Sequence, residues 1–247
     1  MCSIMPPTGL RHFDFRRDHT FGRRTLLAGG VVAGVALVGD GARAAAKEKE
    51  GDEGVGPGED LMREHGVLRR VLLVYREMMR RLETGPETFD PELLQRSTRL
   101  IRKFVEDYHE RQEEELIFPR FEKAKKLTEL VRVLRAQHDA GRKVTDRTIA
   151  LANAAALKDP ARRASLRGEL AAFVRMYEAH AAREDTVLFP ALHEIMRHSE
   201  YDALGEDMER REHKVFGGEG FEPAVAEVAS IEKALGIEDL AKLTPAT

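Results

Sequence analysis

One motif occurs twice in this chain, and it limits the possible folds more than any other feature. Each copy has a histidine, a glutamate four positions later, an acidic residue directly after it, and an apolar-Phe-Pro run; the copies align without gaps at His109–Pro119 and His180–Pro190. Residues four apart lie one above the other on an α-helix, so each histidine and its glutamate share a helical face. Two further histidines, His65 and His138, lie 73 residues apart, close to the 71 residues that separate His109 from His180. This repeat predicts a duplicated helical hairpin.

Apolar residues recur at helical spacing in four segments. We expect the first helix to begin near Asp60, the third to run over about 127–157, and the second and fourth to begin at two aspartate-proline pairs, Asp90-Pro91 and Asp159-Pro160. Aspartate is a good N-cap and proline fits the first helical position. Short connections make neighbouring helices antiparallel. The pattern therefore predicts an all-α, up-down-up-down four-helix bundle.

Each expected helix places its histidine in the inward apolar stripe. The stripe of the fourth helix continues beyond its histidine through Glu184 and Val187. The composition agrees with packed helices, since 42% of the residues are hydrophobic, only 6% are aromatic and tryptophan is absent. Beyond residue 44 acidic side chains outnumber basic ones, 40 to 34. That balance argues against a nucleic-acid partner, which needs a basic surface.

Residues 1–46 have the features of an export signal. A basic stretch with Arg23-Arg24 precedes a short apolar run over 26–38, and small residues follow at 44–46. The arginine pair favours the twin-arginine route, with the general secretory route as the alternative. The run is too short to span a membrane comfortably, so we expect no transmembrane span after cleavage. The expected location is the periplasm or cell envelope, and 47–59 is expected to be a flexible linker.

The repeated glutamates raise the question of what neutralises them. Glu113 and Glu184 would be buried, and no lysine or arginine shares their stripes, so as unpaired carboxylates they would each cost several kcal/mol. A divalent cation removes that cost. The only cysteine is Cys2, so the ligands would be imidazole and carboxylate, which suit iron, manganese or zinc. A metal-free bundle leaves these glutamates unexplained, and a ferritin-like site needs two Glu-x-x-His motifs where only Glu106-x-x-His109 is found.

This pattern resembles the hemerythrin-like family over residues 60–197. That family has a histidine on the first and third helices, and a His-x3-Glu followed by a Leu-Phe-Pro-like run on the second and fourth. The resemblance implies two non-haem iron ions joined by an oxo or hydroxo bridge. It assigns one iron to His65 and His109, the other to His138 and His180, and the bridging role to Glu113 and Glu184. Members that carry oxygen reversibly have a fifth histidine where this chain has Arg142.

Residues 198–247 are expected to form a C-terminal helical extension. It would contain a helix ending near His213, a glycine-rich break, and a helix from Phe221 with Pro223 in its first turn. Because six side chains leave iron with open positions, we predict His213 as an additional ligand. His193 and His198 lie off the stripe and are not expected to bind metal.

The resulting functional hypothesis is an exported di-iron protein that reacts with or senses oxygen, nitric oxide or peroxide. Two alternatives stay open: an iron-trafficking or iron-centre repair protein, and a di-iron oxidase or peroxidase with a turnover cycle. The enzyme would need an acid–base residue near the metal. By periodicity the candidates are Tyr75, Tyr108 and Tyr177. The sequence identifies no partner protein.

Overall fold

The fold is known from a computed structural model, which describes residues 55–84 and 89–245. The expected export signal, and all but the end of the expected linker, lie outside the described residues. The described part is built from helices. They are α1 (Pro57–Thr84), α2 (Pro91–Leu100), η2 (Ile101–His109), α3 (Glu110–Gln112), η3 (Glu113–Ile117), α4 (Phe118–Ala124), α5 (Thr128–Leu151), α6 (Ala154–Lys158), α7 (Pro160–Arg183), η4 (Glu184–Leu188), α8 (Leu192–Ile195), α9 (His198–Phe216), α10 (Phe221–Leu235) and the short 3₁₀ helix η5 (Leu240–Leu243).

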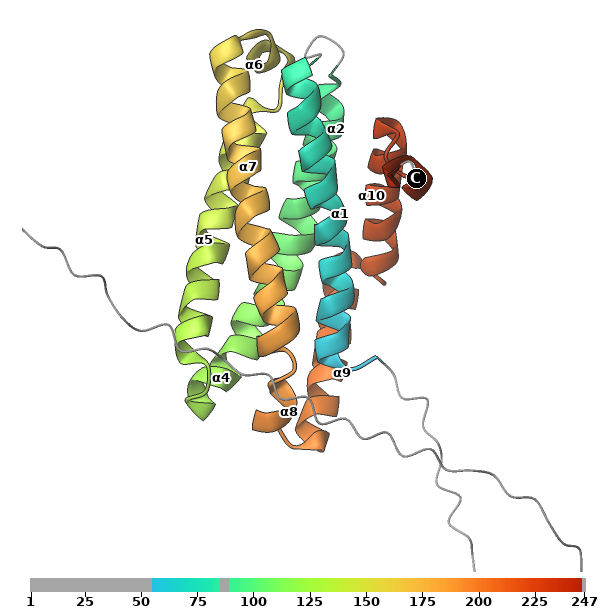
Figure 1. Ribbon diagram of the computed structural model, residues 1–247. Helices are drawn as coiled ribbons and strands as arrows, with labels where there is room; N and C mark the ends of the chain where they lie inside the picture. Colours follow the sequence, from blue (N-terminus) through green and yellow to red (C-terminus); the bar gives the residue numbers. More distant parts are fainter. Residues whose placement is uncertain (1–54, 85–88, 246–247) are drawn as a thin grey trace, which may run out of the picture. The chain divides into compact units, whose positions relative to one another are not determined.

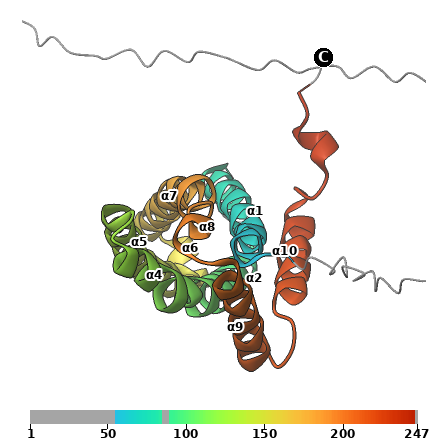
Figure 2. The ribbon, with the colours of Figure 1, turned by 90° about the horizontal axis from the view of Figure 1, so that it is seen from below.

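Four long helical segments form the bundle, as the sequence predicts. They are α1, the continuous run from α2 to α4, α5, and α7 with η4. Viewed along its axis, the bundle is a ring in which α7 lies between α1 and α5 (Figures 1 and 2). The segment η2 contacts both α1 and α5 and closes the ring. The prediction of an all-α four-helix bundle is confirmed.

The helix starts follow local capping chemistry. The Asp90 side chain accepts a hydrogen bond from the backbone N–H of Glu92, and Asp159 does the same at the start of α7. Two expected boundaries were wrong. Helix α1 begins at Pro57 rather than near Asp60. The third helix ends at Leu151, because the Asn153 side chain caps a separate short helix, α6.

The two motif copies contain the same irregularity, a π-helical turn. The segments η3 and η4 begin at Glu113 and Glu184, and in each the N–H five residues on donates to the glutamate carbonyl. The proline after each phenylalanine has no N–H to continue a regular helix. The extra residue rotates the inward face, so that Leu188 is fully buried and the predicted Val187 is only half-buried.

The apolar core consists of two separate clusters. One surrounds Phe104, Phe173 and Tyr177 and extends towards α6. The other contains Phe118, Phe189 and residues of α9, at the opposite end of the bundle. On each of the four long segments, the histidine lies at the boundary between these clusters. The bundle therefore has a polar layer between two apolar ones.

The C-terminal helices pack outside the ring (Figure 2). Helix α9 contacts α1 and α8, and its Tyr201 hydroxyl accepts a hydrogen bond from the backbone N–H of Gly58 at the start of α1. Helix α10 packs against α1 and α2, where Glu232 forms a two-point ion pair with Arg70. The predicted extension is therefore helical, although α9 continues beyond His213 to Phe216.

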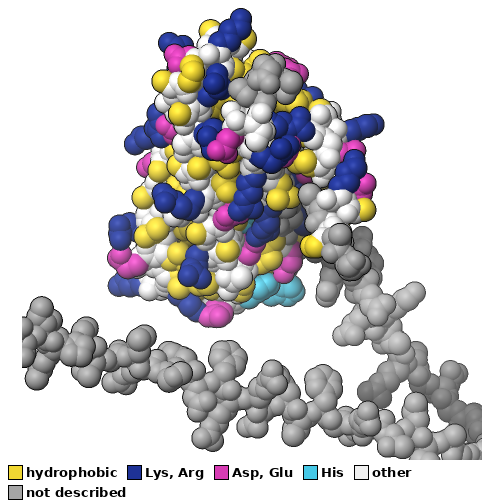
Figure 3. Space-filling view, turned by 45° about the horizontal axis from the view of Figure 1, so that its top comes forward, with side chains coloured by type: hydrophobic (Ala, Val, Ile, Leu, Met, Phe, Trp, Pro, Cys, Tyr) yellow, Lys and Arg dark blue, Asp and Glu magenta, His cyan; other side chains and the backbone are white. Residues whose placement is uncertain are grey.

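The surface and the helix lengths bear on possible partners. Lysine and arginine side chains are scattered over the face drawn in Figure 3, with acidic side chains among them. In the part of the chain that the structure describes, none of the helices has the length and apolar character needed to cross a bilayer.

Candidate metal centre

Six side chains from four helical segments converge in the polar layer. They are His65 on α1, His109 on η2, Glu113 on η3, His138 on α5, His180 on α7 and Glu184 on η4. Each is at most 3% exposed. The structure thus brings together six of the seven residues that the sequence singles out.

The four histidines form two pairs whose Nε2 atoms face each other. The Nε2 atoms of His65 and His109 are 3.1 Å apart, and those of His138 and His180 are 3.2 Å apart. The two pairs contain the same residues that the family resemblance assigns to separate ions.

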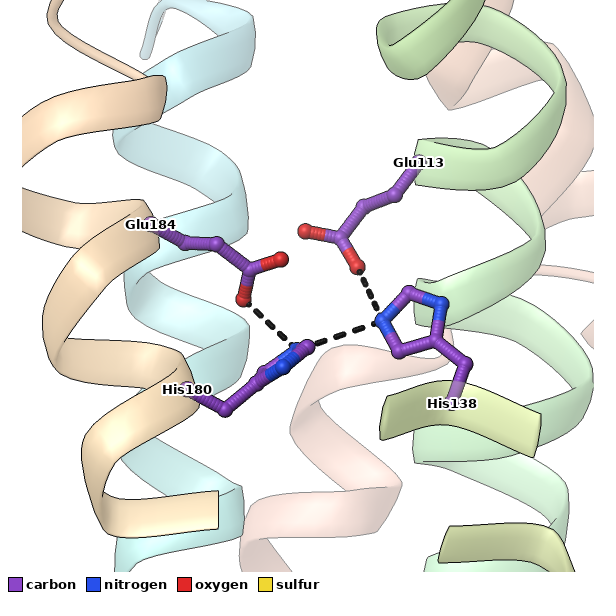
Figure 4. Close-up of side chains that lie close together, drawn as sticks. All are labelled: Glu113, His138, His180 and Glu184. Atoms are coloured by element: carbon purple, nitrogen blue, oxygen red, sulfur yellow. Dashed lines mark hydrogen bonds and ion pairs between the residues drawn. The ribbon is translucent and has the colours of Figure 1, made fainter. Parts of the chain in front are cut away.

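Glu113 reaches both pairs. Its Oε2 atom lies 3.7 Å from Nε2 of His109 and 3.3 Å from Nε2 of His138. Figure 4 shows its carboxylate pointing towards the same centre as the His138 ring. One carboxylate therefore lies between a histidine of the first pair and a histidine of the second.

Glu184 has the equivalent position on the other side. Its Oε2 atom lies 3.4 Å from Nε2 of His65 and 2.9 Å from Nε2 of His180. Close to each pair there is thus a set of ligand atoms within 4.8 Å of one another, and Glu113 belongs to both sets. This geometry suits two cations with shared carboxylates.

Each histidine uses its outer nitrogen, Nδ1, to contact an oxygen acceptor. The acceptors are Asp185 for His65 at 2.6 Å, Glu64 for His109 at 2.6 Å, Glu114 for His138 at 3.0 Å, and Gln137 for His180 at 3.0 Å. These partners assign the proton of each neutral ring to Nδ1. All four Nε2 atoms then present lone pairs to the centre, as in metal-ligating histidines.

Burial also favours neutral histidine rings in this layer. It lowers the pKa of His109, and it lowers the pKa of His138 to about 4, so both rings are neutral at pH 7. Burial and the neighbouring Glu184 carboxylate raise the pKa of Glu113 well above its usual range. None of the carboxylate oxygens of Glu113 and Glu184 has a hydrogen-bond partner among the described residues. Inward lone pairs and unpartnered carboxylates fit a bound cation.

Comparison with known proteins agrees with this geometry. Residues 57–192 match the family described as Hemerythrin HHE cation binding domain. The chain belongs to this hemerythrin family. Uncharacterized proteins of Mycobacterium bovis and of two strains of Mycobacterium tuberculosis are each 50% identical to it over 187 residues, or 76% of this chain and 73% of the relative. No solved structure matches it significantly.

In the hemerythrin domain, one arginine, Arg142, pairs with two glutamates beside the candidate metal centre. Arg142 pairs with Glu110 at 2.8 Å and with Glu114 at 2.7 Å. The Tyr177 hydroxyl donates to the other oxygen of Glu110 at 2.6 Å. Gly141 makes room for this hydroxyl, because a Cβ atom there would lie 2.0 Å from it. Glu110, Glu114 and His138 are close enough to form a third metal group, but Arg142 already pairs with both of its carboxylates.

The prediction for His213 needs correction. Its side chain is exposed on α9, and it belongs to none of the groups of potential ligands in the described residues. The charged sequence around it places it on the solvent face of a helix that packs outside the ring. His193 and His198 are also exposed, as expected. The hemerythrin match ends before α9, so the predicted ligand came from a segment outside the family domain.

The sequence interpretation missed part of the layer around the ligands. Glu114 and Asp185, the acidic residues directly after the glutamate in each copy of the motif, each hydrogen-bond a ligand histidine. Glu64 and Gln137 were overlooked. Each directly precedes a histidine of the repeat, and this shared position was the signal that could have revealed them. Among the three candidate tyrosines, Tyr177 packs against a ligand ring, with centroids 5.4 Å from His180.

Proposed function

We propose that this hemerythrin-family protein is an exported non-haem di-iron protein that reacts with or senses oxygen, nitric oxide or peroxide. The observation that carries the proposal is the pair of carboxylates, Glu113 and Glu184, each within reach of both histidine pairs and each without a hydrogen-bond donor. Two shared carboxylates and two imidazoles per ion suit a pair of bridged ions better than a single ion.

In this proposal, His65 and His109 hold one iron, and His138 and His180 hold the other. Glu113 and Glu184 would be shared by both ions. Imidazole and carboxylate ligands, with no thiolate in the described residues, suit iron. When bound, the iron pair supplies redox chemistry and open positions for a small molecule. The protein's part is to keep each Nε2 atom unprotonated through its Nδ1 partner, and to exclude bulk water by burial.

The position next to the third-helix histidine favours reaction or sensing over reversible oxygen carriage. Arg142 occupies the position where hemerythrins that carry oxygen reversibly have a fifth histidine. Its guanidinium forms ion pairs with two carboxylates. The chain therefore offers fewer protein ligands there, and a small molecule has more room to bind.

A second candidate function is a di-iron oxidase or peroxidase. The specific support is the buried Tyr177 hydroxyl, which donates to Glu110 while its ring packs on His180. A hydroxyl–carboxyl pair next to the metal layer is suited to moving a proton during turnover. Steady consumption of peroxide, lost in Tyr177→Phe and retained in Tyr75→Phe, would favour this function.

Export is part of the proposal because of the arginine pair and apolar run at residues 23–38. The twin-arginine route carries folded proteins, so iron could be inserted before export. Arg23-Arg24 replaced by Lys-Lys should block export, whereas the general secretory route would tolerate this change. Cell fractionation with an antibody against the mature domain would measure the outcome.

The deciding experiment is anaerobic loading of the mature protein with ferrous iron. We expect saturation at about two irons per chain and two bridged ferric ions after oxidation. Optical and Mössbauer spectra would then be followed on adding oxygen, nitric oxide and peroxide. Glu115→Gln is the control for a substitution at Glu113, because Glu115 is an exposed carboxylate two residues away. It should leave the iron content and the spectra unchanged. Saturation at one ion, or a preference for zinc, would contradict the di-iron proposal.

A further inference from the structure

The hydrogen bonds to Nδ1 of the four histidines follow the internal repeat with one exception. The acidic residues that follow the two shared glutamates, Glu114 and Asp185, occupy equivalent positions and contact Nδ1 of His138 and His65. Each also pairs with an arginine, Arg142 for Glu114 and Arg69 for Asp185. A carboxylate paired with arginine therefore backs one histidine of each pair, and Glu114 also pairs with Arg111 at 3.0 Å.

The other half of the layer is not equivalent. Glu64 and Gln137 each directly precede a ligand histidine of the repeat. Glu64 contacts Nδ1 of His109 through a carboxylate oxygen at 2.6 Å, whereas Gln137 contacts Nδ1 of His180 through an amide oxygen at 3.0 Å. At this equivalent position, a carboxylate backs one ligand of the first pair and a neutral amide backs one ligand of the second pair.

That difference changes the strength of the ligand. A carboxylate that accepts the Nδ1 proton increases the basicity of the ring, so Nε2 becomes a better electron donor to a cation. A neutral amide fixes the ring orientation but donates less charge. Glu64 is only 2% exposed, so solvent screens its effect little.

We propose that Gln137 makes the two metal positions unequal, so that the ion on His138 and His180 is held more weakly than the ion on His65 and His109. The inference rests on the proposed two-ion function. Loss of a hydrogen-bond partner behind a ligand changes metal affinity by roughly 10–100-fold, and we expect a gap of that size between the two binding steps.

Access from solvent favours the same side. Gln137 lines a groove of about 620 Å³ between α5 and α7, together with the small residues Ala179 and Ala182. Glu64, the equivalent residue, is buried. The position backed by Gln137 therefore has a residue of its hydrogen-bond layer in the wall of a groove, and we expect a chelator to remove its ion first.

The test is an anaerobic titration with ferrous ion against a competing chelator. Wild type should bind two ions in two separate steps. Gln137→Glu should tighten the weaker step by about 10–100-fold and bring the two steps together. Glu64→Gln should weaken the stronger step by a similar factor. The double variant, with both changes, should restore two separate steps.

Controls separate the hydrogen bond from general charge and from folding. Ala136→Glu adds the same charge at an exposed neighbouring position and should leave both steps unchanged. Circular dichroism checks that each variant stays helical, and Gln137→Glu alone suffices if Glu64→Gln does not fold. The inference is overturned if Gln137→Glu tightens the stronger step, changes neither step, or acts no more than Ala136→Glu. A wild-type protein that binds fewer than two ions would instead contradict the proposed function.

Discussion

The Nε2 atoms of His65 and His109 lie 3.1 Å apart, although the Nδ1 atom of each ring already contacts a carboxylate. Two neutral rings with Nδ1 protons cannot hydrogen-bond through Nε2, because both atoms are acceptors. The Nε2 atoms of the second histidine pair also face each other, although there one Nδ1 contacts a carboxylate and the other the Gln137 amide oxygen. With a cation bound, the two histidines of each pair and the shared carboxylates would serve as its ligands.

Removing one shared carboxylate should therefore disrupt metal binding more than folding. We expect Glu113→Ala or Glu184→Ala to lose the bridged centre while the helices persist, since packing of the apolar stripes supplies most of the stability. Metal content, magnetic coupling of the irons and circular dichroism would measure these effects. Retained antiferromagnetic coupling in either variant would argue against a bridging role.

The exposed position of His213 leads to a contrasting expectation. His213→Ala should leave iron content, spectra and reactivity towards oxygen unchanged, because the side chain lies on the solvent face of α9. His109→Ala is the comparison, and it should lower iron binding sharply. A changed iron spectrum in His213→Ala would restore this residue as a ligand.

Two glycines provide a matched test of packing beside the metal centre. Gly141→Ala would place a Cβ atom 2.0 Å from the Tyr177 hydroxyl, so the hydrogen bond to Glu110 must shift. We expect the free energy of unfolding to fall by roughly 1–3 kcal/mol.

The control for this substitution is Gly168→Ala on α7. A Cβ atom there has open space around it, so greater helix propensity should raise the free energy of unfolding by up to about 1 kcal/mol. Urea denaturation would measure both variants. Equal effects of the two substitutions would show that Tyr177 is not fixed by Gly141.

Metal binding should release a proton at pH values below the raised pKa of Glu113. The pKa of Glu113 is raised well above its usual value of 4.5, so the metal-free carboxyl is protonated at pH values between that value and its raised pKa. A cation must displace this proton, and metal affinity should fall as the pH falls through that range, by up to about tenfold per pH unit.

Calorimetric titration in two buffers with different ionisation enthalpies would count the released protons. The histidines should contribute little, because burial already keeps the His109 and His138 rings neutral. Binding heats that are identical in both buffers would contradict a protonated Glu113.

The ligands that the structure brings together were predictable because they repeat. Histidine and glutamate one turn apart, found twice and followed by Phe-Pro, identify both a helical face and a polar layer. The aspartate-proline pairs located two helix starts, since their capping chemistry is local. The end of α5 was missed because the competing Asn153 cap has only a weak sequence signal.

Other errors arose where tertiary packing or an irregular helical turn determines which side chains face the centre. The shift from Val187 to Leu188 follows from a π-turn, which a fixed helical period does not anticipate. The ligand role of His213 was inferred from a coordination deficit, but the path of α9 outside the ring depends on long-range packing. The difference between Glu64 and Gln137 gained meaning only when each was seen behind a histidine.

The division of the core into two apolar clusters has a consequence for cooperativity. In the metal-free chain, the half near α6 and the half near α9 each have their own apolar contacts, and between them lies a layer of facing lone pairs and carboxylates. Bound ions would tie all four long segments together at that layer. Metal loading should therefore couple the hydrogen-exchange rates of the two halves, which would otherwise open independently.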